Sequence, residues 1–400
     1  MSGKPEKTRL QLGIIPLVDA APLIVARDKG YFAAHGLDVD VRVEASWASI
    51  RDKLVAGVLD GAQMLAPMPL AATLGIDGIG VPMVTALALS LNGNSIAVSE
   101  SLYRELHLER REPVGAGRAL KALLARDRAV GRRPRVFAHV FPYSTHHYLL
   151  RYWLAASGID PDRDLRLEVI PPPLMVQHMG DGRIDGFCVG APWGAAAEAA
   201  GVGYRIVNTY QIWNNGPEKV FGVTRAWAQK HPRTHRAVVS ALLDACRWLD
   251  APEHRAEGAQ LLIDSGTVNA PPATIRTALE VPWAGDSFFG TGLVFHRHAA
   301  NFPWVSQAMW FIEQMRRWGQ IGDGIDAAEV AAQVYQPQLY REAAAALDVP
   351  CPLADCKTEG GHAGVWGLHT PEGLLTMGAD AFLDGAVYSA DGCRSEAGAC

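Results

Sequence analysis

The first fifty residues alternate between apolar runs and amphipathic segments in the order strand, helix, turn, strand. Residues 12–15 form a short apolar run, Asp19 can cap the helix that follows, Pro22 suits its first turn and Gly30 suits its end. Two strands joined by a right-handed helical crossover predict a parallel sheet. Because open α/β folds bind small ligands at the carboxyl edge of such a sheet, this stretch predicts one wall of a ligand site.

The same alternation continues along the chain, with a break before Arg135. We expect strands at residues 60–65, 83–89, 96–98, 136–140, 165–170, 184–189, 204–208 and 219–224. We expect helices at residues 46–56, 67–75, 145–156 and 175–179, and further helices that start at Pro192, Ala226, Arg236, Pro272 and Trp304. This alternation is typical of a three-layer α/β architecture. It predicts two lobes joined by crossovers near residues 99–110 and 208–213, with a cleft that suits hinge closure around a ligand.

The predicted division of the chain has four parts. Residues 1–105 form the first part of lobe 1, residues 106–210 form lobe 2, and residues 211–345 return to lobe 1 with C-terminal helices. Residues 346–400 form a tail that is rich in Gly and Ala and holds four of the six cysteines: Cys351, Cys356, Cys393 and Cys400. With His362 and His369 these thiols are candidate metal ligands, but no C-x2-C pair is present. We therefore expect a flexible, reduced tail or partner arm, with no metal and no cofactor.

A basic segment interrupts the alternation. Residues 104–135 contain ten Lys or Arg residues. One interpretation is a face for a partner or for nucleic acid, and the other is a solvated amphipathic helix beside the crossover. No aromatic residue is interleaved before Phe137, which favours the second interpretation.

Composition excludes several classes of protein. The chain is 49% hydrophobic and 20% charged, as in ordinary soluble proteins, and its formal charge of −5 argues against a protein dedicated to nucleic acid. No apolar run reaches the ~18 residues that a membrane span needs. The N-terminus has positive charges but no apolar stretch of the signal-peptide kind, so we expect a cytoplasmic location.

Motifs of catalysis are also missing. The sequence has no G-x-S-x-G elbow, H-E-x-x-H pair, Walker loop or G-x-G-x-x-G after a strand. His146 and His147 are adjacent, so they do not share one helix face as zinc ligands do. We therefore expect a protein that is not an enzyme.

Hydrogen-bond donors stand at loop or helix-start positions. Trp47 offers an indole N–H, Asn94 an amide, Thr145 and His146 lie at an expected helix start, and Lys219 follows a polar turn. Donors of this kind, together with a helix N-terminus, suit a small anion. Each residue also has an alternative role: core packing for the indole, turn formation for the amide, capping for the imidazole and surface exposure for the ammonium.

Several motifs resemble the nitrate- and bicarbonate-binding proteins of the NrtA and CmpA family. They include GYFAAHGLDVDVRVEASW, LDGAQMLAPMPLAATLG, LNGNSIAVS, STHHYLLRYWLAASGIDPDRD, VIPPPLMVQHMGDGRIDGFCVGAPW and NNGPEKVFGVT, and the resemblance covers about residues 9–340. It implies a type II periplasmic-binding-protein fold with the ligand in the interdomain cleft. It also implies pocket roles for Trp47 of EASW, His146 and Lys219 of PEK. The family's NGQ glutamine falls on Asn94, whose amide is shorter, and its GEPWN segment is GAPWG here, which removes a carboxylate at Ala191.

The resemblance implies a small anion as ligand. We expect nitrate or nitrite rather than bicarbonate, because none of the candidate residues is a carboxylate that accepts the bicarbonate O–H, with Glu218 the one neighbour that can change this. The chain is similar to the cytoplasmic nitrate sensors of the NasS type, which implies a NasT-like antiterminator protein as partner and no direct contact with nucleic acid. The alternatives are the binding receptor of a nitrate, nitrite or bicarbonate ABC transporter, and an enzyme on the same fold.

Overall fold

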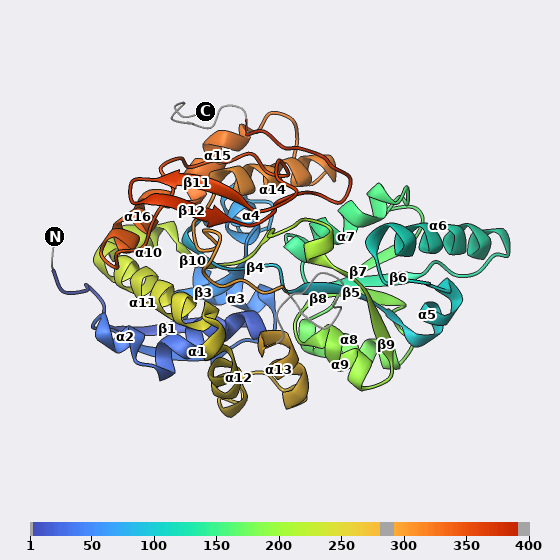
Figure 1. Cartoon of the computed structure of the whole chain (residues 1–400), viewed down its shortest axis with the longest axis horizontal. Coiled ribbons are helices and arrows are strands. Elements are labelled where there is room, and N and C mark those ends of the chain that lie inside the picture. Colours follow the sequence, from blue (N-terminus) through green and yellow to red (C-terminus); the bar gives the residue numbers. More distant parts are fainter. Residues whose placement is uncertain (1–2, 281–291, 391–400) are drawn as a thin grey trace.

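The computed structural model describes residues 3–280 and 292–390 and shows two lobes side by side, each built around a five-stranded sheet (Figure 1). The first sheet has the order β2-β1-β3-β10-β4. Its strands are β1 (Arg9–Ile14), β2 (Asp38–Val43), β3 (Gly61–Leu65), β4 (Met83–Leu91) and β10 (Pro217–Thr224). The second sheet has the order β7-β6-β8-β5-β9, with β5 (Asn94–Ser99), β6 (Val136–His139), β7 (Arg166–Val169), β8 (Gly186–Gly190) and β9 (Gly203–Asn208). The chain therefore forms lobe 1, crosses to lobe 2 and returns to lobe 1.

Helices surround both sheets. Those of lobe 1 are α1 (Ala21–Asp28), α2 (Tyr31–Ala34), α3 (Trp47–Val55), α4 (Met68–Leu74), α10 (Arg225–Lys230), α11 (Pro232–Asp250), α12 (Arg255–Asp264), α13 (Pro272–Glu280), α14 (Val305–Arg317), α15 (Ala327–Val334) and α16 (Pro337–Ala345). Those of lobe 2 are α5 (Glu100–Leu106), α6 (Pro113–Ala129), α7 (Thr145–Ala156), α8 (Met175–Gly180) and α9 (Trp193–Ala199). None of the helices in the described residues is long and apolar enough to cross a membrane.

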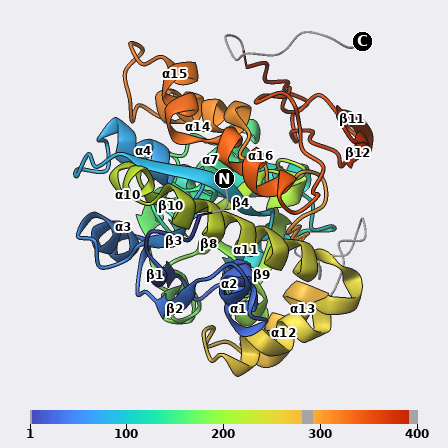
Figure 2. The ribbon, with the colours of Figure 1, turned by 90° about the vertical axis from the view of Figure 1, so that its left-hand side faces the viewer.

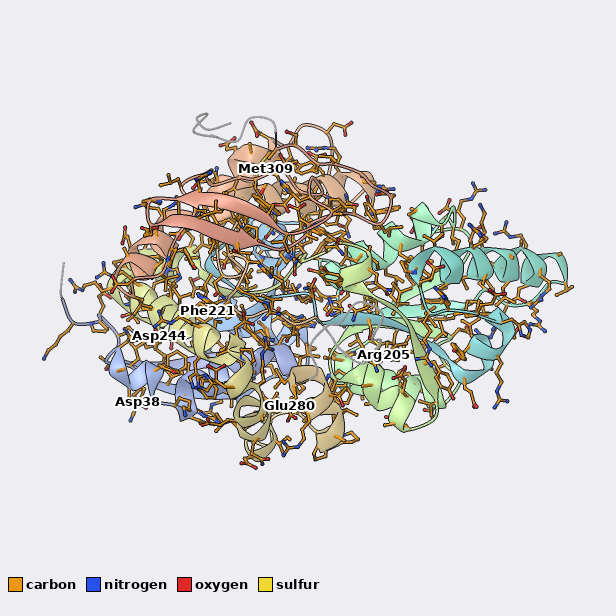
Figure 3. The ribbon with its side chains drawn as sticks, viewed as in Figure 1. Asp38, Arg205, Phe221, Asp244, Glu280 and Met309 are labelled. Atoms are coloured by element: carbon orange, nitrogen blue, oxygen red, sulfur yellow. The ribbon has the colours of Figure 1, made fainter. Side chains whose placement is uncertain are left out.

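The parallel pairing expected for the first two strands is confirmed for β1 and β2. Both sheets are nevertheless mixed, because β10 and β5 run antiparallel to their neighbours. Strand β10 lies antiparallel between β3 and β4, where Lys219 pairs with Leu65 on one side and with Ser90 on the other. Phe221 of the same strand is fully buried in lobe 1 (Figure 3). The strand that returns from lobe 2 fills the gap between β3 and β4, and this pairing places Lys219 inside the lobe 1 sheet with a strand on each side.

The first crossover is earlier than the sequence predicted. Strand β5 already pairs antiparallel with β8 and β9 of the second sheet, so the chain changes lobes at the turn between β4 and β5 and not at residues 99–110. Asn92 and Gly93 form this turn with φ of 61° and 96°. Positive φ at both residues suits the Asn-Gly pair, because these residue types adopt it at low cost.

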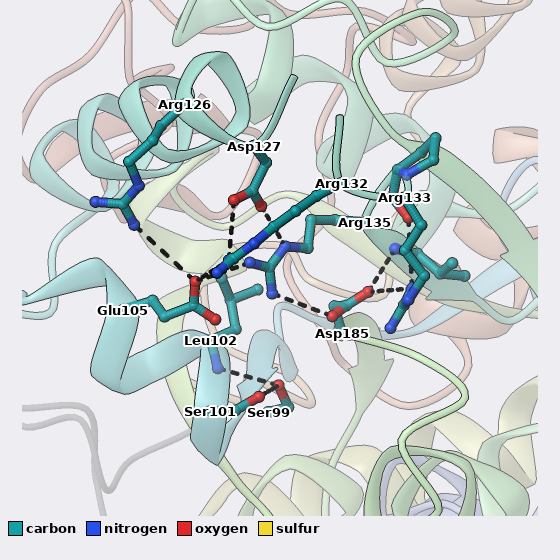
Figure 4. Close-up of polar contacts among 12 residues, drawn as sticks. Ser99, Ser101, Leu102, Glu105, Arg126, Asp127, Arg132, Arg133, Arg135 and Asp185 are labelled. Atoms are coloured by element: carbon teal, nitrogen blue, oxygen red, sulfur yellow. Dashed lines mark hydrogen bonds and ion pairs between the residues drawn. The ribbon is translucent and has the colours of Figure 1, made fainter. Parts of the chain in front are cut away.

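The basic segment is held by ion pairs inside lobe 2 (Figure 4). The Arg135 guanidinium is buried and contacts Asp127 at 2.7 Å, Glu105 at 2.9 Å and Asp185 at 3.4 Å. Although burial acts in the opposite direction, Arg135 and Arg132 lower the pKa of both Glu105 and Asp127. The segment is thus largely the two helices α5 and α6, with several of its charges paired against acidic residues of the same lobe.

The C-terminal extension (residues 351–390) is ordered, so the expectation of a flexible tail is wrong for these residues. It contains the hairpin β11 (Trp366–Thr370) and β12 (Gly373–Met377), which is drawn in red at the upper right of Figure 2. Cys351 has a free thiol, as expected for a reduced tail. Cys356 is disulfide-bonded, so the expectation of reduced cysteines is wrong for this residue. Cys393 and Cys400 lie outside the described residues.

An aromatic cluster joins the extension to both lobes. Phe382 stacks on Trp213 of the second crossover with ring centroids 4.8 Å apart, and it also packs on Trp310 of α14 and on Tyr152 of α7. The Tyr152 hydroxyl donates to the carboxylate of Asp384 at 2.8 Å. The extension therefore bridges lobe 1, the crossover and the helix that carries His146.

Candidate functional site

Four of the five residues expected to bind an anion lie together between the lobes. Lys219 is on β10 of the lobe 1 sheet, Trp47 is the first residue of α3, Asn94 begins β5, and His146 is in the first turn of α7. Each is at most 1% exposed. Lobe 1 supplies the ammonium and the indole, while lobe 2 supplies the amide and the imidazole.

The Lys219 ammonium is the centre of this buried cluster. Its Nζ lies 2.9 Å from Asp19 Oδ2, contacts Glu218 Oε1 and is 5.6 Å from the centre of the Trp47 ring. Burial by itself lowers the pKa of Lys219, but the two carboxylates outweigh it and raise the pKa above the ordinary lysine value. The side chain is therefore a cation throughout the physiological pH range.

Two carboxylates in the cluster overturn the expectation of a pocket without acceptors. Glu218 accepts a hydrogen bond from Asn94 Nδ2 and lies 3.5 Å from His146 Nδ1. Burial raises the pKa of Glu218 despite the neighbouring Lys219. Asp19, expected to cap a helix, makes no such cap and instead accepts from Gln63 Nε2 at 2.6 Å.

Sequence reasoning missed Asp19 and Gln63 as members of the site. Gln63 is a fully buried polar residue in the middle of a strand whose other residues are buried and mostly apolar, and its Oε1 accepts from the Ile15 amide at 3.0 Å. A polar residue at such a position was the available signal, since buried polar side chains are rare unless they have a partner.

Several buried polar atoms of the cluster have no hydrogen-bond partner in the described part of the chain. They are Trp47 Nε1, both ring nitrogens of His146, and Asn94 Oδ1. Burial and the nearby Lys219 lower the pKa of His146 far below its ordinary value, so its imidazole is neutral and carries one N–H. Unpaired buried groups cost about 1–3 kcal/mol each, and a bound ligand with complementary atoms removes that cost.

Two capped helix N-termini position the side chains of Trp47 and His146. Ser46 Oγ accepts from the Ser49 amide at 3.2 Å at the start of α3, and Ser144 Oγ accepts from the His147 amide at 3.0 Å at the start of α7. These caps fix the first turns that carry Trp47 and His146. The N-termini of both helices therefore adjoin the cluster, and their dipoles favour negative charge there.

Thr145, the fifth expected residue, has a different role in this structure. Its hydroxyl donates to the Pro217 carbonyl at 3.3 Å and so ties α7 to β10. Further contacts between the lobes are the hydrogen bond from the Val18 amide to the Ala191 carbonyl at 2.9 Å and the one from Trp193 Nε1 to the Pro16 carbonyl at 3.2 Å. The lobes are thus closed onto each other around the cluster.

The GAPWG segment borders the site. A Cβ added at Gly190 would lie 3.3 Å from Asn94 Oδ1 and 3.5 Å from Asp19 Oδ2. Ala191 follows directly, and its backbone contacts Gly93 and Val18 beside the cluster. A small neighbouring hollow is lined by Asn94, Ala191 and Arg205 among others, and it reaches the cluster at Asn94.

The adjacent histidines of α7, His146 and His147, point toward different side chains. His147 Nδ1 lies 3.2 Å from His139 Nε2, while His146 faces Glu218. Across residues 3–280 and 292–390, no group of three or more His, Cys, Asp or Glu side chains has a geometry that holds a metal ion. His362 of the extension, named above as a candidate ligand, contacts Asp380 and stacks on Trp366.

Two lobes closed around a buried, ligand-complementary cluster define a binding protein of the periplasmic-binding-protein fold, as the sequence predicted. Comparison with solved structures agrees: the crystal structure of the periplasmic nitrate-binding protein NrtA from Synechocystis PCC 6803 has a TM-score of 0.82 and 31% identity, with 96% of each chain covered. Residues 3–263 match the NMT1-like family. The chain belongs to this family, within the group that contains NrtA and CmpA.

The curated relatives differ in how much of their own length this chain matches. The nitrate/nitrite binding protein NrtA of Synechocystis is 35% identical, covering 86% of this chain and 78% of that protein. The bicarbonate-binding protein CmpA of Synechococcus elongatus is 33% identical, covering 96% and 85%. The nitrate import ATP-binding protein NrtC of Synechocystis is 39% identical over 86% of this chain, but the chain spans only about half of its length (51%).

Proposed function

We propose that this protein binds a small monovalent oxyanion between its lobes and is not an enzyme. The observation that carries the proposal is the buried Lys219 ammonium beside the N–H of Trp47 and the imidazole of His146, neither of which has a hydrogen-bond partner among the described residues. These groups supply one positive charge and at least two neutral donors to a site closed on both sides by protein. The names of the relatives NrtA and CmpA support nitrate, nitrite and bicarbonate as ligands to test.

The charge pattern alters the argument for nitrate over bicarbonate. That argument required a pocket without carboxylates, whereas Asp19 and Glu218 both contact Lys219. Nitrate accepts hydrogen bonds only, and the donors of the site satisfy it. Bicarbonate has in addition an O–H, and a carboxylate of Asp19 or Glu218 is a partner for it. The site therefore fits both anions, and direct titration decides between them.

The transport receptor is the better supported role. The similarity to NrtA and CmpA, and to part of the transport ATP-binding protein NrtC, supports a receptor of an ABC transporter. The disulfide at Cys356 adds support, because structural disulfides are typical of oxidising compartments outside the cytoplasm. The cytoplasmic sensor with a NasT-like partner stays a prediction.

Intrinsic fluorescence tests the binding proposal directly. Trp47 lies in the site, so titration with nitrate, nitrite and bicarbonate is expected to change the emission in a saturable way for at least one of them. Chloride at matched ionic strength is the control. If none of the three anions changes the emission or gives heat in calorimetry, the protein does not have the proposed function.

A second experiment separates receptor from sensor. The anion-loaded protein is added to liposomes that hold the cognate permease and ATPase, and the rate of ATP hydrolysis is measured. A receptor stimulates hydrolysis only when loaded. A sensor leaves the rate unchanged and, in its anion-free form, binds an RNA-binding antiterminator in a pull-down assay.

A further inference from the structure

The buried cluster around Lys219 carries more negative than positive charge before any ligand enters. Asp19 and Glu218 contribute two carboxylates and Lys219 contributes one ammonium, and each is at most 2% exposed. A monovalent anion beside them adds a second uncompensated negative charge in a place from which water is excluded. Like charges repel strongly in such surroundings, so anion binding is favoured when one carboxylate is neutralised.

The other titratable groups that face Glu218 are neutral and do not supply the missing positive charge. His146 on α7 is neutral because burial and Lys219 lower its pKa. Cys188 on β8 is neutral because burial and Glu218 raise its pKa. The indole and the amide that complete the cluster do not titrate. The carboxylates of Glu218 and Asp19 are therefore the two groups of the cluster left to compare as the site of an entering proton.

The contacts assign this proton to Glu218. Glu218 holds the Lys219 ammonium and the Asn94 amide, which are donors that an entering anion needs. Once protonated, Glu218 leaves the ammonium to the anion and becomes an O–H donor itself. Asp19 is held on its other oxygen by Gln63 at 2.6 Å and keeps Lys219 in place at 2.9 Å. Burial also raises the pKa of Glu218 above its ordinary value.

We propose that the site takes up its anion together with one proton from solvent, and that Glu218 holds this proton. The Glu218 carboxylate becomes a carboxylic acid, and no other bond forms or breaks. The loaded cluster then has one excess negative charge instead of two. This inference rests on the proposed function, since it concerns the same anion in the same site.

Calorimetry in two buffers with different heats of ionisation measures the number of protons taken up. Nitrate is the probe because it does not titrate in the range studied. The expected uptake rises toward about one proton per nitrate as the pH is raised above the pKa of Glu218 in the anion-free protein, and the affinity then falls by about tenfold per pH unit. Equal heats in both buffers at every pH, with nitrate bound, overturn the proposal.

Three variants locate the proton. Glu218→Gln keeps the shape of the neutral acid, so it is expected to bind nitrate without proton uptake and without the pH dependence. Asp19→Asn is expected to retain the uptake, and loss of uptake there instead contradicts the assignment. Glu359→Gln is the matched control, because Glu359 is a fully buried glutamate that contacts Lys357 and Ser306 outside the cleft.

The outcomes separate this inference from the proposed function. The two-buffer measurement on the unmodified protein decides the question even when Glu218→Gln does not fold. If nitrate does not bind but bicarbonate does, the same measurement is made with bicarbonate, corrected for its own ionisation. Anion binding without proton uptake defeats the proton linkage alone, whereas the absence of binding by nitrate, nitrite and bicarbonate defeats both.

Discussion

The ammonium nitrogen of Lys219 lies 2.9 Å from Asp19 Oδ2, so the short 3₁₀ helix between β1 and α1 supplies a counter-charge to a residue of β10. Glu218 supplies a second one from the neighbouring position. The three charges stand in a closed interior next to an indole N–H and an imidazole for which the described part of the chain provides no hydrogen-bond partner. This arrangement leads to predictions about the ligand site and about the parts of the fold that hold it.

Replacing Lys219 removes the charge that attracts the anion. Lys219→Ala is expected to weaken nitrate binding by at least ~2 kcal/mol, the scale of a charge-assisted hydrogen bond. It also leaves Asp19 and Glu218 buried without their cation, which costs about 3–5 kcal/mol of stability. Calorimetric titration and urea unfolding measure the two effects.

Lys357 provides the matched control for this variant. Its side chain is 9% exposed and contacts Glu359 at a short distance and Asp380 at 3.2 Å in the C-terminal extension. Lys357→Ala is expected to lower the free energy of unfolding by a similar amount and to leave the nitrate affinity unchanged. An equal loss of affinity in both variants means that the effect at Lys219 is one of folding and not of binding.

Replacing Trp47 tests its indole donor. Trp47→Phe removes an N–H that makes no hydrogen bond within residues 3–280 and 292–390, so the free energy of unfolding is expected to change little. The nitrate affinity is expected to fall by about 1.5–3 kcal/mol, the scale of a hydrogen bond to a charged group. Trp153→Phe is the control, because the Trp153 indole is buried and donates to the Pro113 carbonyl at 2.8 Å. That variant is expected to lose stability and to keep its affinity.

Lobe 2 depends on Arg135 in a pH-dependent manner. Arg135→Met leaves Asp127, Glu105 and Asp185 without their shared buried partner and is expected to cost about 3–5 kcal/mol at neutral pH. The arginine lowers the pKa of Glu105 and Asp127 in the folded protein. Their stabilising contribution is therefore full above the unfolded pKa and is lost as the pH falls through the lower folded pKa.

Urea unfolding at neutral and acidic pH checks this sign. The difference between Arg135→Met and the unmodified protein is expected to shrink as the solution is acidified below the ordinary carboxyl pKa. A difference that is constant with pH contradicts the electrostatic explanation. Arg128→Met is the control, because Arg128 is 66% exposed beside Asp164 and is expected to change stability by less than about 1 kcal/mol.

The extension contributes to stability through its aromatic cluster. Phe382→Ala removes a ring packed on Trp213, Trp310 and Tyr152 and is expected to cost about 3–5 kcal/mol in the free energy of unfolding. Leu374→Ala, at a side chain in β12 that is 65% exposed, is the control and is expected to change little. Equal unfolding midpoints for the two variants would contradict the packing role.

The local sequence pattern predicted many of the individual helices and strands. The helix expected at residues 145–156 is α7, and the strand expected at residues 219–224 lies within β10. These elements are readable because capping residues, prolines and apolar periodicity act over a few neighbouring residues. Four candidate ligand residues also gather in the structure, and the resemblance to known binding proteins had selected them from residues with several ordinary roles.

Only the tertiary structure decided which strands belong to which lobe and which charged residues lie in the site. Whether β5 joins the first or the second sheet depends on which distant edge buries it, and neighbouring residues do not carry that information. The same holds for Asp19, which reads locally as a helix cap but meets Lys219 because β10 inserts antiparallel between β3 and β4. The sequence by itself determined the elements and the donors, whereas long-range strand pairing placed two carboxylates among those donors and so set the electrostatics of the cleft.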